Sequence, residues 1–288
     1  MQSLYDVAAP AKLNLFLHIT GRRADGYHLL QSVFMLIDWC DTLHFELRTD
    51  GLITREDLTI DQPTSIALPA DDLTVRAARA LQQACGTPLG VHIGLEKRIP
   101  AQAGMGGGSS DAASCLLALQ RLWGVRLPAA RLQALALSLG ADVPFFLSGG
   151  HAWVEGIGEE ITPLSLPPAQ FVVVKTAAGL STQHIFTVPS LKRDTDTARI
   201  QGFATNDELE LYRFGKNDLQ PVAQQLCAAL SQSLDWLAAH QLQGRMTGSG
   251  SAVFARLPKD VSVDFQAAPS DWIVHQCRNL SQHPLANW

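Results

Sequence analysis

Long apolar segments are missing from this 288-residue chain, which has no run near the roughly 18 residues that a membrane-spanning helix needs. Near the start, Asp6 and Lys12 interrupt the place where a signal peptide would have its apolar core. We therefore expect neither a membrane helix nor a signal peptide. A cytoplasmic location is the prediction that follows.

Basic charge is also scarce. Lysine and arginine total 22 against 27 aspartates and glutamates, so the formal net charge is −5. No basic run or charged tail occurs, which argues against a nucleic-acid partner, because such binding needs a basic face. A hydrophobic content of 47% and a charged content of 17% are typical of a packed globular protein. The length is sufficient for two ordinary domains.

Patterns of metal-binding residues are absent as well. The nine histidines form no HxxxH or HxxEH pair, so we expect no structural metal site. The cysteines are odd in number, widely spaced and without a CxxC motif, which predicts reduced and mostly buried thiols. They are Cys40, Cys85, Cys115, Cys227 and Cys277.

Against these absences stands a glycine-rich segment, residues 104–113, between a strand-like run (91–100) and a helix-like run (111–123). Glycine lets backbone amides approach a ligand closely, and a following helix directs unpaired N–H groups and its positive end at the loop. This combination predicts a phosphate site. The residues expected to form it are Gly104, Gly106, Gly107, Gly108, Ser109 and Ser110.

The loop does not fit two better-known templates. A Walker A loop ends in Gly-Lys-Ser/Thr, whereas Gly108 is followed directly by Ser109. A dinucleotide fingerprint needs a glycine three residues after Gly106, and Ser109 occupies that position too. One of the two serines is expected to cap the helix, with Asp111 in its first turn. A surface turn before a helix is the alternative interpretation.

The first 50 residues predict a β-rich meander. Strand-like runs occupy residues 13–19, 32–38 and 41–48. Lys12 and Asn14 fall on alternate positions of the first run and so share a face. From this segment alone they are either solvated or part of a site.

Two helices are predicted farther along, over residues 73–85 after an acidic pair and over 129–139 after a proline, and each is followed by glycine. Lys97 lies near the end of the strand before the glycine loop, and it either faces a nucleotide or is an ordinary exposed cation. Asp142 stands alone among apolar residues, so it either has a partner and a function or bonds its own backbone.

A proline-rich stretch over residues 163–168 is the best candidate for a domain boundary. Two short strands are predicted just before it, over 151–157 and 159–164. We therefore expect an N-terminal domain over residues 1–165 and a C-terminal domain over residues 166–288.

The C-terminal part begins with a buried-strand pattern over residues 171–176. A polar stretch of mixed charge, 187–207, predicts a mobile loop, and residues 217–238 predict one helix. A second glycine–serine loop, 244–254, feeds a strand. It is either a hairpin turn or, together with the first loop, part of a ligand site.

Three segments resemble the GHMP small-molecule kinases: residues 10–15 (Pro-Ala-Lys-Leu-Asn-Leu), the loop 104–113, and residues 247–250 (Thr-Gly-Ser-Gly). Two more, 23–28 (Arg-Ala-Asp-Gly-Tyr-His) and 139–145 (Leu-Gly-Ala-Asp-Val-Pro-Phe), are similar to the branch that phosphorylates a cytidine-diphosphate sugar alcohol in isoprenoid biosynthesis. The resemblance covers nearly the whole chain.

The resemblance implies an α+β, two-domain GHMP kinase fold. Its N-terminal domain, like domain 2 of ribosomal protein S5, would bind ATP, and its C-terminal domain would be ferredoxin-like, with the active site in the cleft between them. It also implies ATP and Mg²⁺ as cofactors, Asp142 as the proposed base and Lys12 as its partner.

For the ligands, the resemblance implies ATP contacts at Lys97 and along the glycine loop. Asp72 stands where many members have asparagine, so an adenine hydrogen bond is not carried over to it. The substrate contacts that the resemblance implies are Asn14, Tyr27, His28, Thr182 and Phe186, with cytosine between the rings of Tyr27 and Phe186.

Three other functions are open at this point. One is a GHMP kinase acting on homoserine, mevalonate or a sugar, which the cytidine-site residues argue against. A nucleotide-binding oxidoreductase would need the dinucleotide fingerprint that the loop lacks. A non-catalytic metabolite-binding protein on the same fold would have lost Lys12 or Asp142, and both are present.

Overall fold

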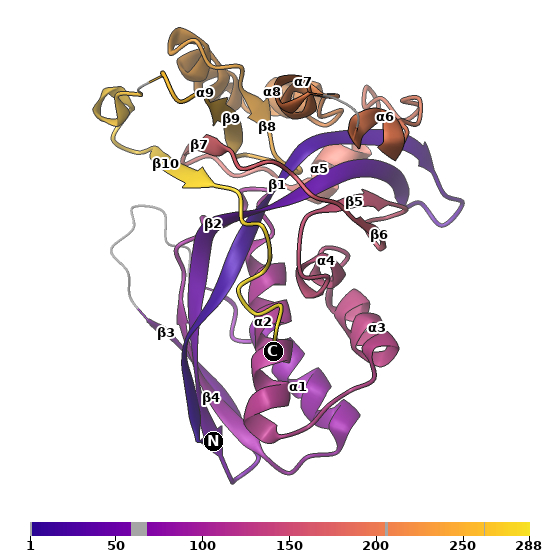
Figure 1. Cartoon of the computed structure of the whole chain (residues 1–288), viewed down its shortest axis with the longest axis vertical. Coiled ribbons are helices and arrows are strands. Elements are labelled where there is room, and N and C mark those ends of the chain that lie inside the picture. Colours follow the sequence, from indigo (N-terminus) through magenta and orange to yellow (C-terminus); the bar gives the residue numbers. More distant parts are fainter. Residues whose placement is uncertain (1, 59–67, 205–206, 262) are drawn as a thin grey trace.

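The computed structural model describes residues 2–58, 68–204, 207–261 and 263–288, and in this part of the chain the strands form two sheets (Figure 1). The larger sheet has the order β3-β4-β2-β5-β6, with β1 paired to β2. Its strands are β1 (Ser3–Arg22), β2 (His28–Arg48), β3 (Ile53–Leu58), β4 (Gly90–Glu96), β5 (Ala152–Glu155) and β6 (Glu160–Pro163). All pairs are antiparallel except β3 and β4.

The predicted meander of three strands is wrong in one respect. The runs 32–38 and 41–48 belong to one strand, β2, because its pairing with β1 continues through Pro10 opposite Cys40 and Ala9 opposite Asp41. The opening of the chain is therefore a single long hairpin.

Four helices pack on one side of this sheet (Figure 1): α1 (Leu73–Cys85), α2 (Gly107–Trp123), α3 (Ala129–Leu139) and α4 (Val143–Leu147). The bounds predicted for α1 and α3 are confirmed. However, α2 begins four residues before the expected Asp111. Gly106, with φ of 70°, is its N-cap, so the expected capping by Ser109 or Ser110 is wrong, and Asp111 lies beyond the first turn.

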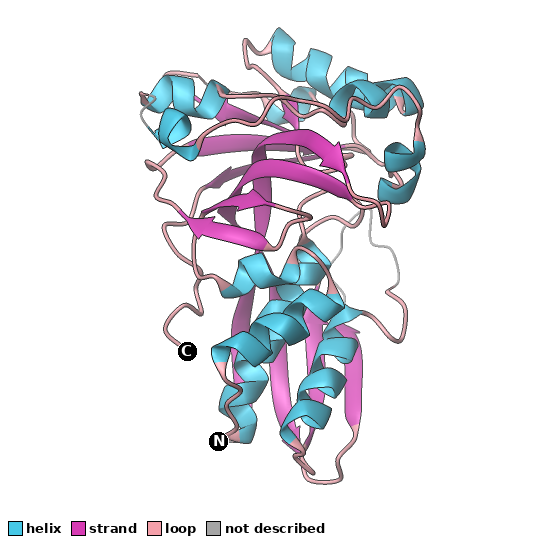
Figure 2. Ribbon diagram, turned by 90° about the vertical axis from the view of Figure 1, so that its right-hand side faces the viewer, coloured by secondary structure: helices cyan, strands magenta, loops and turns pink. Residues whose placement is uncertain are grey.

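The smaller sheet has the antiparallel order β10-β7-β9-β8. Its strands are β7 (Gln170–Lys175), β8 (Arg245–Met246), β9 (Val253–Leu257) and β10 (Ile273–Arg278). In Figure 2 this half is the upper part of the molecule, where its strands lie among several helices. They are α5 (Thr182–Thr187), α6 (Ile200–Ala204), α7 (Glu208–Arg213), α8 (Gln220–Leu226) and α9 (Ala228–Ala239), and a 3₁₀ turn covers Phe265–Ala267.

Two predictions for this half need correction. The single helix expected over 217–238 is two helices, α8 and α9, separated at Cys227, whose backbone is extended. The stretch 187–207 contains α6, and α7 follows it unpredicted. Among the described residues, no helix combines the length and apolar character needed to cross a bilayer.

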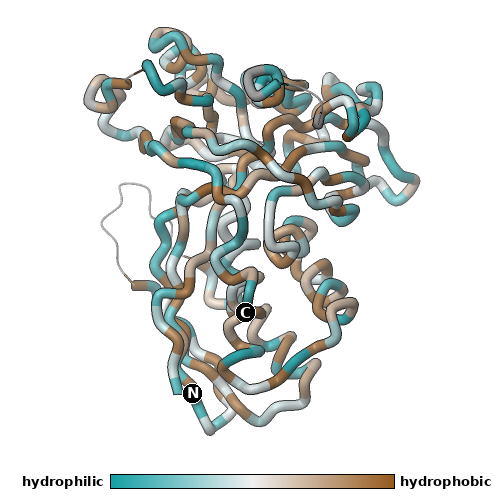
Figure 3. The backbone as a smooth tube through the Cα atoms, in the orientation of Figure 1, coloured by the Kyte–Doolittle hydropathy of each residue, from teal (hydrophilic) through white to brown (hydrophobic). Residues whose placement is uncertain are grey.

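Hydrophobic residues occur along the strands and helices of both halves (Figure 3) and form three buried clusters. One cluster crosses between the halves, since it contains Leu13 and Met35 of the long hairpin together with Phe171 and Phe254 of the smaller sheet. The chain after β10 also returns to the first half (Figure 1), where Leu285 joins the core beneath the larger sheet. The two halves are therefore packed against each other at a shared core.

Candidate active site

A cleft of about 1330 Å³ brings the predicted site residues together. All of them line it except Ser110, which is fully buried. Its walls come from the long hairpin, the glycine loop with the start of α2, the segment before α1, the start of α4, and α5 with the second glycine loop. Residues widely separated along the chain thus share one cavity.

The two glycine loops meet at the wall of this cleft. Ser251 N donates to Gln102 O at 3.0 Å, and Ala252 N donates to Ala103 O at 3.2 Å. Gly104 has φ of 73°, and a Cβ there would lie 2.2 Å from the carbonyl oxygen of Thr247, so only glycine fits. The second loop is therefore part of the site wall rather than an isolated hairpin turn.

Lys12 and Asp142 form an ion pair beside the glycine loop. The distance from Lys12 Nζ to Asp142 Oδ2 is 3.7 Å, and Lys12 Nζ donates to Asn14 Oδ1 at 2.5 Å. The Lys12 amide donates to the carbonyl oxygen of Met105, which ties β1 to the loop. The shared face predicted for Lys12 and Asn14 is confirmed, and both side chains are buried.

The electrostatics of this pair are asymmetric. Burial lowers the pKa of Lys12, and the nearby charge of Asp142 opposes that shift. The lysine also lies over the ring of Phe34, with Nζ 4.6 Å from the centroid. Asp142 is at the N-cap of α4 but makes no capping hydrogen bond, and a third of its side chain is exposed to the cleft. Its carboxylate is thus paired on one side and open to a ligand.

Two further residues orient the amide of Asn14. Asn14 Nδ2 donates to Ser32 Oγ at 2.9 Å, and Thr247 Oγ1 donates to Asn14 Oδ1 at 3.3 Å. These partners were not predicted as site residues. Thr247 belongs to the Thr-Gly-Ser-Gly segment already noted in the sequence. Ser32 lies in no motif, and only the folded hairpin brings it next to Asn14.

The start of α2 opens onto the cleft. Residues 106–109 line the cavity. A Cβ on Gly106 would lie 3.0 Å from the ring of Phe146 and 3.3 Å from Lys12 Cγ, so the backbone there packs closely around the catalytic candidates. Ser110 faces the interior instead, and its hydroxyl has no hydrogen-bond partner among the described residues.

Lys97 lines the cleft, but its ammonium group bonds two aspartates of the protein. It bonds Asp111 Oδ2 at 2.7 Å and also Asp41 Oδ2, and both aspartates are fully buried. Burial opposes the charged form of Lys97, but the two carboxylates outweigh it and raise the pKa of the lysine. Burial raises the pKa of Asp111 in spite of Lys97. The ammonium group of Lys97, which the resemblance assigned to ATP, is therefore already paired with two carboxylates of the protein.

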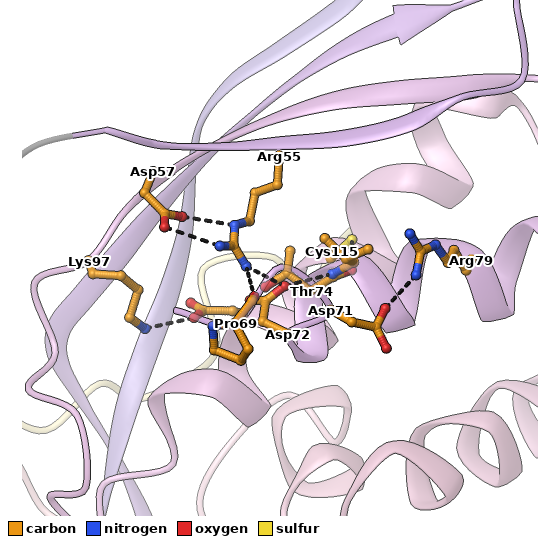
Figure 4. Close-up of polar contacts among 11 residues, drawn as sticks. Arg55, Asp57, Pro69, Asp71, Asp72, Thr74, Arg79, Lys97 and Cys115 are labelled. Atoms are coloured by element: carbon orange, nitrogen blue, oxygen red, sulfur yellow. Dashed lines mark hydrogen bonds and ion pairs between the residues drawn. The ribbon is translucent and has the colours of Figure 1, made fainter. Parts of the chain in front are cut away.

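Asp72, the departure from the family pattern, is engaged in the same way (Figure 4). Its carboxylate accepts from Val75 N at 3.1 Å as the N-cap of α1, and Arg55 Nη1 lies 2.7 Å from the same oxygen. Arg55, a nearly buried residue of β3, also pairs with Asp57 and donates to the carbonyl oxygen of Pro69. The arginine therefore fixes the backbone at this wall of the cleft.

The far end of the cleft is aromatic. The rings of His28 and Phe186 stack with centroids 4.8 Å apart and an angle of 30°, and Tyr27 is 60% exposed. In this structure the partner of Phe186 is His28, whereas the resemblance pairs it with cytosine and Tyr27. Thr182 Oγ1 lies 2.6 Å from Ser249 Oγ, which joins α5 to the second glycine loop.

Comparisons with known proteins agree with this geometry. Residues 72–150 match the GHMP kinases N terminal domain, and residues 201–269 match the GHMP kinases C terminal domain. The chain is 73% identical to a 4-diphosphocytidyl-2-C-methyl-D-erythritol kinase of Polaromonas sp. strain JS666, over all of this chain and 95% of the relative. It is 64% identical to the enzyme of the same name from Acidovorax sp. strain JS42, over all of this chain and 99% of the relative.

Solved structures give the same result. A crystal structure of 4-(cytidine 5'-diphospho)-2C-methyl-D-erythritol kinase superposes with a TM-score of 0.72 and 37% identity, over 86% of this chain and 88% of the other. A homoserine kinase from Cytophaga hutchinsonii superposes with a TM-score of 0.70 at 15% identity, over 98% and 96% of the two chains, and shows the shared fold. The predicted α+β GHMP kinase fold is confirmed, and the chain belongs to the 4-diphosphocytidyl-2-C-methyl-D-erythritol kinase family of GHMP kinases.

Proposed function

We propose that this chain transfers the γ-phosphoryl group of ATP to the 2-hydroxyl of 4-diphosphocytidyl-2-C-methyl-D-erythritol in the non-mevalonate (methylerythritol phosphate) pathway to isoprenoid precursors. The observation that carries the proposal is one cleft with a Lys12–Asp142 pair beside a glycine loop and an aromatic surface at the far end. The high identity to enzymes of that name over the whole chain supports the same substrate.

In the proposed reaction, Asp142 accepts the proton of the substrate hydroxyl as its oxygen attacks the γ-phosphorus in line and the bond to the leaving ADP oxygen breaks. Lys12, paired with that carboxylate, adds positive charge where negative charge develops on the transferring group. The exposed third of Asp142 and the buried position of Lys12 fit these tasks. We also assign a contact with the same hydroxyl to Asn14, whose side-chain amide donates to Ser32.

We assign the phosphates of ATP to Gly104, residues 106–109 and the N-terminus of α2, where backbone N–H groups and the helix dipole favour an anion. Among the described residues, no cluster of acidic, histidine or cysteine side chains could hold a metal ion. Mg²⁺ would therefore bind chiefly to the phosphates, with the hydroxyl of Ser109 as the oxygen donor available at the loop. When bound, it would neutralise charge on the phosphates.

In the proposed ATP site, Lys97 contacts the nucleotide through its methylene groups. A lysine stem can cover an apolar surface while its ammonium group bonds elsewhere, and here that group bonds Asp41 and Asp111. At the other end, we propose that Tyr27, His28 and Phe186 form the cytosine pocket and that Thr182 contacts the substrate near its phosphates.

The domain division at residues 165 and 166 is also proposed, because β6 ends at Pro163 and β7 begins at Gln170. The cytoplasmic location stays a prediction from the sequence.

ADP release from Mg-ATP tests the proposal directly. The cytidine-diphospho substrate is run beside methylerythritol phosphate, homoserine and mevalonate. We expect turnover with the cytidine compound only. Turnover with another acceptor would keep the phosphate loop and discard the cytosine pocket, whereas ATP binding without any turnover would favour the non-catalytic alternative.

A further inference from the structure

Arg193 makes an unusually complete set of hydrogen bonds at the aromatic end of the cleft. Its Nε donates to His28 Nε2 at 3.0 Å. Its two terminal nitrogens donate to backbone carbonyl oxygens, Nη2 to Phe186 and Val188 at 3.1 and 3.0 Å, and Nη1 to Leu191 at 3.0 Å. Within the described residues, no carboxylate lies within ion-pair distance of this guanidinium.

These contacts join two parts of the chain that come from different halves of the molecule. His28 begins β2 of the long hairpin, whereas Phe186 belongs to α5. The guanidinium bonds the ring of His28 and the carbonyl of Phe186, and the two side-chain rings stack on each other. A planar group with five N–H donors in fixed directions suits this position, and a lysine could not make the same set of bonds.

The segment that carries Arg193 is itself bonded to the hairpin. Thr195 N donates to the carbonyl oxygen of Ile19 at 3.0 Å, and Ala198 N donates to Gln31 Oε1 at 2.8 Å. These bonds anchor part of the stretch that the sequence predicted to be a mobile loop. Arg193 therefore sits on a supported backbone.

We propose that Arg193 is a positioning residue for the nucleobase end of the cleft, holding His28 and Phe186 in the relative orientation that a base requires. It acts through those two residues and not on the reacting atoms. The identity of the base rests on the proposed function, while the positioning of the two rings does not.

The bond to Arg193 also determines the protonation of His28. Because Nε2 accepts a hydrogen bond, the proton of the neutral ring is on Nδ1. Burial lowers the pKa of His28, and the positive charges of Arg193 and Arg22 lower it further. A protonated ring would lose the bond and face two cations. Removal of Arg193 should therefore raise the pKa of His28 and make the pocket sensitive to falling pH.

The test uses the full-length enzyme with Arg193→Gln, Arg193→Lys and a matched control, Lys192→Gln. Lys192 is the adjacent cation, is exposed, and pairs with Asp194 at the surface. For both Arg193 variants we expect KM for the cytidine substrate to rise about 10- to 100-fold, with kcat and the KM for ATP within about threefold of wild type. The control should match wild type in all three constants.

Histidine titration by NMR supplies a readout that needs no substrate. We expect Arg193→Gln to raise the pKa of His28. We also expect the KM of this variant for the cytidine substrate to rise as the pH falls from 8 to 6. In a His28→Gln background, Arg193→Gln should raise KM for the cytidine substrate by a smaller factor, because the hydrogen bond between Arg193 and His28 is already lost.

Unchanged KM for the cytidine substrate in Arg193→Gln would overturn the inference. Equal losses for both substrates, with an unshifted His28 titration, would reduce Arg193 to a general structural residue. If Arg193→Gln fails to fold, Arg193→Lys and the titration of its His28 decide. Failure of wild type to use any cytidine substrate would instead refute the proposed function, and the titration would still test the positioning.

Discussion

Replacement of Lys97 by methionine should show whether the cleft lysine serves the fold or ATP. The change removes the ammonium group that bonds two fully buried carboxylates, Asp41 and Asp111. Removing one partner of a buried ion pair typically costs about 3–5 kcal/mol, because the remaining charge is buried and uncompensated. For a chain of this length, that corresponds to a fall in Tm of about 5–8 °C.

The loss should depend on pH in a defined direction. Burial already raises the pKa of Asp111 in wild type, and Lys97 opposes that shift, so the folded variant should hold a proton on Asp111 over a wider pH range than wild type. A carboxyl group whose folded pKa is raised destabilises increasingly as pH rises, by about 1.4 kcal/mol per pH unit. The deficit of the variant should therefore shrink from pH 7 to pH 5. Lys97 itself, with a raised pKa, stays charged throughout that window in wild type.

Thermal unfolding of wild type, Lys97→Met and the double variant Lys97→Met with Asp111→Asn measures this. The double variant should recover much of the loss, because Asp41 keeps hydrogen bonds from the amides of Arg98 and Ile99. Lys192→Met is the control, since its exposed ion pair with Asp194 should contribute little to stability. A Lys97→Met enzyme within about 1 kcal/mol of wild type, but with a KM for ATP raised more than tenfold, would refute the reasoning.

The remaining predictions concern the proposed roles directly. Asp142→Asn should lower kcat by at least about 100-fold with little change in the KM for ATP, measured by steady-state ADP release, and unchanged turnover would remove Asp142 as the base. Phe186→Ala should raise the KM for the cytidine substrate about tenfold through lost stacking; if ATP binding weakens instead, the pocket assignment is wrong. Arg55→Gln should cost about 2 kcal/mol in thermal unfolding and raise the KM for ATP, because Asp72 and the backbone at this wall lose their partner. An unchanged KM for ATP would show that this wall does not contribute to ATP binding.

Local signals in the sequence were sufficient for some elements of the fold. The ends of α1 and α3 follow from Asp72, Pro128 and two glycines, and these cues act within a few residues. The start of α2 could not be predicted in this way. Gly107 and Gly108 are poor helix formers in isolation, so local propensity does not predict a helix there. Their surroundings come from the fold, since a Cβ on Gly107 would lie 3.1 Å from the side chain of Ile99.

For the site, the sequence supplied the residues that carry motifs and missed those that act through tertiary partners. Lys12, Asn14 and Asp142 were expected and lie together. Arg193 was missed, because it lies in a polar stretch of mixed charge, and its partners are a histidine and backbone carbonyls that only the fold brings near. The aspartates that hold Lys97 were missed for the same reason.

Two lysines line the same cleft, and their surroundings shift their pKa values in opposite directions. Lys97 faces two buried carboxylates that raise its pKa, so its charge is already matched inside the protein. Lys12 is buried with a neutral amide and one partly exposed carboxylate 3.7 Å away, and burial lowers its pKa. Its positive charge is thus incompletely compensated until an anion enters the cleft. A residue in that state can stabilise a transferring phosphoryl group, because that stabilisation grows as negative charge develops beside it. The difference between the two lysines comes from their partners, which is why lysine in the sequence indicated a site at both positions but could not distinguish their roles.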